Sequence, residues 1–450
     1  MEKVIKNILD NSQIIDLNSQ LFPYEYQQLC LFGIDNLLTN RNIIIELFET
    51  YTGITQEEFN KLTKNNQADI VWQQLFILRT PFSKNTFNIL ISLKKLGFIN
   101  EIENRNLKEI RDRLSKINIH NINIYIEQIF NLANIQYTVM TNQIFNVQEV
   151  KCLDKIFIFK KGDSVMYKKD KEIEKVTILE SHRELGDPGY YTVIYPNKRE
   201  KNTLWKYLFL PEKSFNELTK RFKTSININQ LVFNYQNSLS NGLLKTYGYT
   251  EDIEGIKDYI QYWNHFLQPE YFTLYVENDF IYNNEINGKE DTPSYILENI
   301  IFPLAEKLNL PILFKFIGNN QKNYIYSLSK ICKKHSKIKF LSNYILDQNY
   351  NQIYSILKKY TNLYIYEIFE RDNINYRDKI GISSLNISSD SSVLEELLYK
   401  SENYKQNISQ ILIDKYKKLE ETGWKVPENE IERDINYLLT GAYHNFMTKR

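Results

Sequence analysis

The residues best placed to do chemistry follow a short apolar run near the N-terminus. Residues 14–22 read Ile-Ile-Asp-Leu-Asn-Ser-Gln-Leu-Phe, so polar residues alternate with apolar ones where the run ends. Side chains two apart on a strand point to the same face, which would bring Asn18 and Gln20 together. Amides offer hydrogen-bond donors and acceptors, whereas zinc prefers imidazole, thiolate and carboxylate ligands. The pair therefore favours hydrogen bonding over metal coordination.

A carboxylate near the other end of the chain, Asp390, is a second candidate. It could serve as a metal ligand or as a general base. The competing interpretation is structural: residues 389–392 would open a helix, and Ser392 followed by Glu395 fits a Ser-x-x-Glu capping box. Because no chemical partner is evident, the structural role is favoured for Asp390.

The other side chains that could bind a metal are scattered. No two of the five histidines share metal-ligand spacing, and three cysteines are too few for a metal cluster or a disulfide framework. These residues are His120, His182, His265, His335 and His444, with Cys30, Cys152 and Cys332. We therefore expect no metal and no cofactor.

Strand-like and helical segments alternate along much of the chain. The strand-like segments are 136–141, 224–229, 271–276, 311–317, 338–343 and 362–367, and the helical ones include 253–267, 293–308, 322–335 and 349–359. This alternation is typical of a parallel βα barrel. The predicted fold class is α/β, a (β/α)8 TIM-type barrel with helical additions and a small inserted antiparallel β-barrel.

Further helices are expected outside this repeat. Residues 24–50 predict one helix from their apolar spacing, and residues 393–446 are mostly helical. Thr55 and Glu58 form a capping box that would begin another helix. Gly97 is a candidate helix C-cap.

Several stretches occur in the order found in one enzyme family. They are Leu-Cys-Leu-Phe-Gly-Ile-Asp-Asn-Leu-Leu-Thr at 29–39, Gln-Ala-Asp-Ile-Val-Trp-Gln at 67–73 and Thr-Pro-Phe-Ser at 80–83, then 140–145, 388–394, 414–416 and 422–435. Together they resemble a uronate (glucuronate) isomerase of the amidohydrolase superfamily, with residues 16–98 similar to its first part. The similarity covers most of the chain and implies a barrel.

The departures from this family fall where its chemistry takes place. The resemblance implies a metal held by two histidines on the first strand, usually aided by a later aspartate. By position, Asn18 and Gln20 replace the histidines, while Asp16 and Asp390 remain. The resemblance therefore implies a scaffold whose metal site is vestigial.

Other positions of the family's site also differ. Ser392 stands in place of an arginine, Glu367 and Ile368 in place of a tryptophan pair, and residues 316–321 in place of a basic sugar-binding stretch. These replacements weaken the expectation of isomerase activity further.

Residues 155–212 have a different texture, with short alternating strands between Gly, Asp, Pro and Asn turns. The opening Gly-Asp-Ser-Val-Met-Tyr resembles SH3-like and Tudor-like modules of eukaryotic proteins. Alternation puts Tyr191 and Tyr195 on one face and Tyr190 on the other. The tyrosines would line a partner-binding groove or pack in a core, and Lys168 and Lys169 are further partner-binding candidates.

The predicted organisation is a barrel interrupted by this module: residues 1–154, 155–212 and 213–450. Hydrophobic content of 42% can fill a large core. A net charge of +1 gives no electrostatic basis for nucleic-acid binding. No apolar run reaches the length of a membrane span, and the N-terminus lacks the apolar core of a signal peptide, so a cytoplasmic protein is expected.

These observations predict a catalytically inactive, uronate-isomerase-like scaffold. Its partners would be other proteins, in the cytoskeleton or in another large assembly. One alternative is an active isomerase with a remodelled site, and another is a small-molecule sensor that keeps a pocket without the chemistry. Fold alone does not decide among them.

Overall fold

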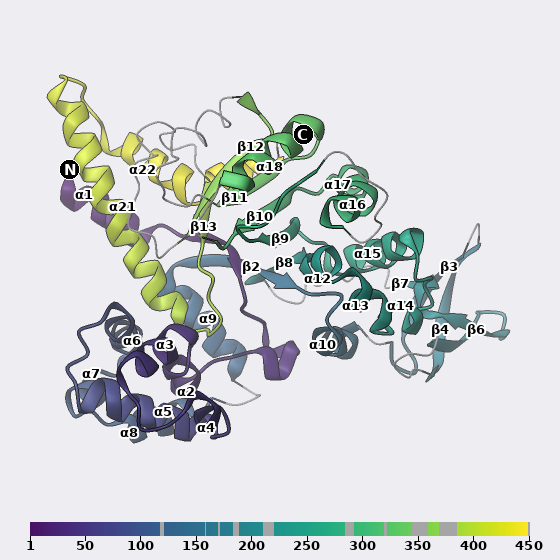
Figure 1. The fold of residues 1–450 in the computed structure, drawn as a ribbon, viewed down its shortest axis with the longest axis horizontal. Coiled ribbons are helices and arrows are strands. Elements are labelled where there is room, and N and C mark those ends of the chain that lie inside the picture. Colours follow the sequence, from purple (N-terminus) through teal and green to yellow (C-terminus); the bar gives the residue numbers. More distant parts are fainter. Residues whose placement is uncertain are drawn as a thin grey trace. The chain divides into compact units, whose positions relative to one another are not determined.

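The structure is a computed structural model, and it describes residues 1–117, 121–157, 159–169, 172–182, 189–209, 220–283, 292–318, 322–343, 359–368 and 385–448. The chain divides into two compact units. The first comprises residues 1–140 with 366–450, and the second comprises residues 141–365. Both are built from parallel strands and helices (Figure 1).

The first unit contains a parallel sheet ordered β2-β1-β13-β12. Its strands are β1 (Ile14–Ser19), β2 (Ile135–Asn142), β13 (Leu385–Ser388) and the end of β12 (Leu363–Ile368). Every residue of β1 is buried, including the polar ones. A strand covered on both faces must satisfy its polar side chains internally, and this requirement shapes the site described below.

The first unit also contains two sets of helices. The N-terminal ones are α1 (Glu2–Asn11), η1 (Tyr24–Leu29), α2 (Ile34–Leu38), α3 (Arg41–Thr50), α4 (Gln56–Asn60), α5 (Lys64–Trp72), η2 (Gln73–Ile77), α6 (Lys84–Lys95), α7 (Ile99–Glu103), α8 (Leu107–Leu114) and α9 (Ile122–Ala133). The C-terminal ones are α21 (Glu396–Glu421), α22 (Glu428–Asn436), η6 (Tyr437–Gly441) and α23 (Ala442–Thr448). The long helix α21, yellow in Figure 1, packs against α1, α6 and α9.

Two local predictions hold and two are wrong. The Thr55–Glu58 capping box is present, and Gly97 follows α6 with a φ of 81°. The single helix predicted over 24–50 is broken into η1, α2 and α3. Gly33, with a φ of 90°, precedes α2, and the Asn40 side chain accepts a hydrogen bond from the Ile43 N–H to begin α3.

The predicted capping box at Ser392 and Glu395 is also wrong. Helix α21 begins at Glu396, and the carboxylate of Glu396 accepts the Ser392 N–H at 3.0 Å. Glu395 instead accepts hydrogen bonds from the Gly33 N–H and the Tyr125 hydroxyl, each at 2.7 Å. The Glu395 carboxylate therefore bonds residues distant in the chain and does not cap the helix.

The second unit contains the parallel sheet β8-β9-β10-β11. The strands are β8 (Phe222–Asn227), β9 (Phe272–Val276), β10 (Ile312–Phe316) and β11 (Phe340–Asn343). The helices are α10 (Val147–Phe157), α12 (Asn229–Phe233), α13 (Tyr235–Ser240), α14 (Leu243–Thr246), α15 (Ile253–Leu267), α16 (Pro293–Ile296), η4 (Leu297–Ile301), α17 (Phe302–Leu308) and α18 (Lys322–Lys334). The helix predicted over 349–359 lies almost wholly outside the described residues.

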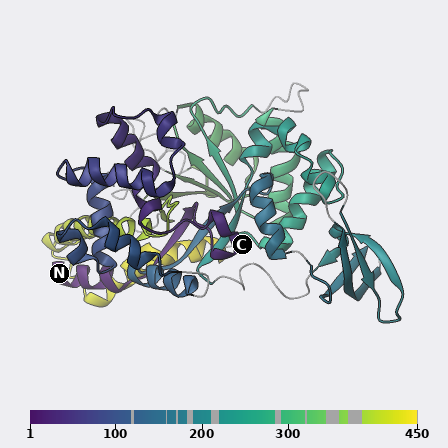
Figure 2. The same ribbon diagram turned by 90° about the horizontal axis from the view of Figure 1, so that it is seen from below.

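The predicted insertion is an antiparallel sheet ordered β6-β5-β4-β3-β7. Its elements are β3 (Ser164–Lys169), β4 (Glu172–His182), β5 (Tyr190–Ile194), β6 (Glu200–Leu204), η3 (Trp205–Tyr207) and β7 (Leu208–Phe209). In Figure 2 this sheet stands apart from the parallel strands of its unit. We call residues 159–209 the inserted module.

The inserted module has its own aromatic core, and this corrects part of the docking hypothesis. Tyr191 and Tyr195 are buried, so they cannot line an exposed groove. Tyr191 packs edge-on against Phe159 and Trp205, at ring-centroid distances of 5.6 Å each. Tyr190 lies on the opposite face, is 37% exposed and stacks on His182.

No described helix combines the length and the apolar character needed to span a membrane.

Candidate functional site

A buried carboxylate, Asp16, joins three neighbouring strands of the first unit. Its Oδ1 accepts the Ser389 N–H at 2.7 Å, and its Oδ2 accepts the Ser389 and Thr138 hydroxyls at 2.6 Å each. Thr138 lies on β2 and Ser389 directly follows β13. Burial raises the pKa of Asp16 to about 6, although these hydrogen bonds oppose the shift. The residue is fully engaged in holding the strand ends together.

Asn18 and Asp390 are in direct contact beside it. The Asn18 amide Nδ2 donates to the Asp390 Oδ1 at 2.9 Å, and the Ser388 hydroxyl donates to the same oxygen at 2.7 Å. The Asp390 N–H donates to the Asn18 carbonyl at 3.0 Å. Asp390 has a φ of 52°, a conformation that aspartate tolerates better than most residues. Asp390 therefore accepts hydrogen bonds from two neutral side chains of the described residues.

Gln20 does not join this cluster. Strand β1 ends at Ser19, so the alternation that would align Gln20 with Asn18 stops one residue too early. The Gln20 side chain is exposed, while its backbone N–H donates to the Ser391 carbonyl at 2.8 Å. The residue contributes a backbone contact between β1 and the segment after β13.

The donor set around Asp390 does not fit the metal that the family resemblance implies. In the described part of the chain it offers one carboxylate, one hydroxyl and an amide whose Nδ2 faces the carboxylate, and no imidazole is among them. Within the described parts of the chain, no group of three His, Cys, Asp or Glu side chains could hold a metal ion. The histidine at 120 lies outside the described residues.

Two buried groups near this cluster escaped the sequence analysis. Lys400 donates to the Ser389 carbonyl at 2.9 Å and pairs with Glu396 at 3.2 Å, with both side chains almost fully buried. The spacing of Glu396 and Lys400, four residues apart on a helix, was the available signal. The pair fixes the loop that carries Ser389 and Asp390 onto α21.

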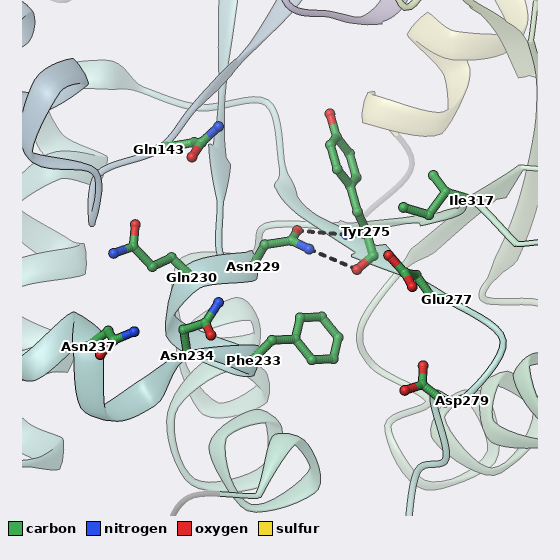
Figure 3. A pocket seen from close by; sticks show the side chains of 10 residues that line it. All are labelled: Gln143, Asn229, Gln230, Phe233, Asn234, Asn237, Tyr275, Glu277, Asp279 and Ile317. Carbon is green, nitrogen blue, oxygen red and sulfur yellow. Dashed lines mark hydrogen bonds between the residues drawn. The ribbon is translucent and has the colours of Figure 1, made fainter. Parts of the chain in front are cut away.

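The second unit carries an open pocket where its parallel strands end, with a volume of about 640 Å³ (Figure 3). In barrel enzymes this is the end of the strands that forms the active site. The lining residues are Gln143, Asn229, Gln230, Phe233, Asn234, Asn237, Tyr275, Glu277, Asp279 and Ile317. None of them was singled out from the sequence alone, except that Ile317 falls in the stretch 316–321.

In one wall of this pocket, the Asn229 side-chain amide pairs with the backbone of Tyr275 as a neighbouring strand would. Asn229 Oδ1 accepts the Tyr275 N–H at 2.7 Å, and its Nδ2 donates to the Tyr275 carbonyl at 2.8 Å. Figure 3 shows both bonds in the middle of the pocket. They tie the start of α12 to β9, which fixes the relative positions of the residues that follow each.

Glu149, which bonds the lining residue Gln143, is a buried carboxyl group. Its Oε1 accepts the Asn142 Nδ2 at 3.1 Å and the Gln143 N–H at 2.8 Å, which anchors the end of β2. Burial raises the pKa of Glu149 to about 8. The group is therefore largely protonated at neutral pH.

We expect Glu149→Gln to stabilise the protein at pH 8 more than at pH 5. Because the folded state holds its proton more tightly than the unfolded state, the Glu149 contribution to stability is present below about pH 4.5 and declines as the pH rises to about 8. Glutamine keeps both accepted hydrogen bonds and carries no charge. The gain should be about 2–3 kcal/mol larger at pH 8, measured by urea unfolding. Glu200→Gln on the exposed edge strand β6 is the control, and an equal gain at both pH values would contradict the prediction.

Comparison with known proteins supports the fold. The chain is similar to a uronate isomerase from Bacillus halodurans, with a TM-score of 0.77 and 22% identity, covering 100% of this chain and 96% of that one. It is also similar to a glucuronate isomerase from Caulobacter crescentus, with a TM-score of 0.58 and 8% identity, covering 100% of this chain and 94% of that one. No protein-family model and no curated protein matches the chain. The chain therefore has a uronate-isomerase-like fold.

Proposed function

We propose that this protein is a catalytically inactive, uronate-isomerase-like scaffold. The observation that carries the proposal is the hydrogen bond from the Asn18 amide to Asp390. Aldose–ketose isomerisation needs a polarised carbonyl, a group that moves a proton and a positive clamp for the uronate carboxylate. Among the described residues, the side chains that donate to Asp390 are the neutral Asn18 amide and Ser388 hydroxyl, and Asp16 is committed to three strand ends. Neither is free for proton transfer.

The same proposal includes two finer structural features. The parallel strands of the two units would complete a TIM-type barrel, which the similarity to uronate isomerases over the whole chain supports. The inserted module would be an SH3-like barrel, which its strand order and aromatic core support. The protein would act in the cytoplasm, with cytoskeletal or other large assemblies as its partners.

Metal content and isomerase activity test the inactivity together. Because the described side chains that bond Asp390 are an amide and a hydroxyl, we expect no stoichiometric zinc, manganese or iron by elemental analysis. We also expect no glucuronate–fructuronate interconversion in a coupled assay. One metal per chain that Asp390→Asn removes would contradict the lost metal site, and turnover that the same substitution abolishes would establish the remodelled isomerase instead.

Docking through the inserted module is the scaffold part of the proposal. Lys168 and Lys169 are exposed at the end of β3, and the Lys169 ammonium lies 5.1 Å from the Tyr207 ring centroid. We expect the double variant Lys168→Glu and Lys169→Glu to lose acidic protein partners in pulldown, while thermal unfolding stays unchanged. Lys61→Glu, at an exposed lysine directly after α4, is the control for charge reversal outside the module. If the double variant recovers every partner unchanged, Lys168 and Lys169 are not part of the docking surface.

A sensor function is the second candidate, and the pocket of the second unit favours it. The pocket lies where barrel folds place their ligands, and its lining differs from what a uronate requires.

A further inference from the structure

The pocket at the strand ends of the second unit carries the wrong charge for a uronate. Its described lining includes Glu277 and Asp279 but no lysine, arginine or histidine. Both carboxylates are exposed and follow the end of β9. A sugar acid entering here would meet like charge, whereas an ammonium group would be attracted.

A row of amides faces these acids across the pocket. In Figure 3 the side chains of Gln143, Gln230, Asn234 and Asn237 lie on one side, and Glu277 and Asp279 lie on the other. Among the described residues, these four amides make no side-chain hydrogen bond, unlike Asn229, which is committed to Tyr275. Each can donate to and accept from a ligand hydroxyl, so the row suits a molecule that carries several hydroxyls.

An apolar surface lies between the amides and the acids. Phe233 is 40% exposed at the end of α12 and occupies the middle of the pocket in Figure 3. Ile317, 49% exposed, lies on the acidic side after β10. An aromatic face among hydrogen-bonding groups suits a ring that is apolar on one face and polar at its edge.

One cation lies close to the pocket without lining it. The Lys315 ammonium is 4.8 Å from the Tyr275 ring centroid, and the residue is only 7% exposed. Tyr275 lines the pocket, while Lys315 does not. A ligand carboxylate would therefore have to displace Tyr275 to pair with this lysine.

We propose that this pocket binds a cyclic polyol bearing an amino group, an amino sugar in chemical class. The hydroxyls would bond the amide row, the carbon face of the ring would rest on Phe233, and the ammonium would pair with Glu277 and Asp279. The proposal uses none of the residues that carry the inactive-scaffold proposal. Its failure would leave that proposal standing, and the reverse also holds.

Three sugars of matched size test the ligand class by titration calorimetry: D-glucosamine, D-glucose and D-glucuronate. We expect glucosamine to bind about 1.5-fold to fivefold more tightly than glucose, the range for exposed charge pairs, and glucuronate to bind most weakly. Phe233→Ala should weaken all three. The double variant Glu277→Gln and Asp279→Asn should keep glucose binding and lose the preference for glucosamine, because the shapes are preserved and only the charges are removed.

Matched controls separate this site from general effects. Glu428→Gln and Glu432→Gln, which remove two carboxylates from a different cavity in the first unit, should leave the preference unchanged. Glucuronate binding as tightly as glucosamine would overturn the proposal, as would binding of none of the three sugars. A preference for glucosamine that survives the double variant would place the binding elsewhere and would also overturn it.

Discussion

Asp16→Ala should destabilise the first unit by about 3–5 kcal/mol, the cost of leaving several buried donors without an acceptor. The Asp16 carboxylate accepts the Ser389 N–H and two hydroxyls, those of Ser389 and Thr138, and it is completely buried. Alanine removes the common acceptor and leaves a cavity where β1, β2 and β13 meet. Urea unfolding followed by far-UV circular dichroism would measure the loss.

Asp16→Asn separates lost hydrogen bonding from lost charge. The asparagine carbonyl can still accept the Ser389 N–H, and the two hydroxyls can rotate to accept from its amide. We therefore expect a loss well below that of Asp16→Ala at pH 7. If the two variants lose equal stability, the geometry around Asp16 is not the source of its contribution.

The pH dependence gives an independent check on Asp16. Since burial raises its pKa to about 6 in the folded state, its contribution to stability is present below about pH 4 and declines as the pH rises to about 6. Asp16→Asn should therefore remove a downward slope of stability between pH 4 and pH 6. A slope that persists in this variant would have to come from another carboxyl group.

The partners of Asp16 show which part of the site the sequence could not predict. Thr138 lies 122 residues away and Ser389 lies 373 residues away, and no local pattern links either to Asp16. The family resemblance placed Asn18 and Asp390 at corresponding positions of one site, and the structure has them in contact. Gln20 lies outside this contact because β1 ends at Ser19. The alternation of polar and apolar residues does not predict where a strand ends.

Local structure was predictable where a capping residue and regular spacing agreed. The helix expected over 253–267 is α15, which Asp252 begins by accepting the Gly255 N–H. The break between η1, α2 and α3 was missed because Asn40 is one of many asparagines in this chain. Composition alone does not distinguish an asparagine that caps the start of a helix from an asparagine that lies inside one.

In the inserted module, alternation separated Tyr190 from Tyr191 and Tyr195 correctly, but it could not say which side faces inward. The deciding residue is Trp205, which follows β6 and fills the space beneath Tyr191. It packs against Tyr247 and Tyr262, from the end of α14 and from α15, and these helices begin 38 and 48 residues after Trp205 in the chain. Without the contacts to α14 and α15, the sequence of the module is consistent both with a tyrosine core and with an exposed tyrosine groove.

Trp205→Ala should cost about 3–5 kcal/mol, the range for removing a large buried aromatic side chain. The indole is fully buried, 5.2 Å from the Tyr247 ring centroid and 6.3 Å from that of Tyr262, so it joins the module to α14 and α15. Two hydrogen bonds accompany it: the Lys206 side-chain ammonium donates to the Gly248 carbonyl at 2.7 Å, and the Gly189 N–H donates to the Thr246 carbonyl at 3.0 Å.

Because of this joint, replacing the whole module by a short linker should also lower the melting temperature. Closing the chain across the gap costs little, but the deletion would expose Tyr247 and Tyr262 to water. Hydrogen exchange should increase first in α14 and α15, in both the deletion and the Trp205→Ala variant. Tyr190→Ala removes an exposed aromatic from the same module and should stay within about 0.5 kcal/mol of the parent. If the deletion variant has the melting temperature of the parent protein, the module does not stabilise α14 and α15. Trp205 would then stabilise the module alone.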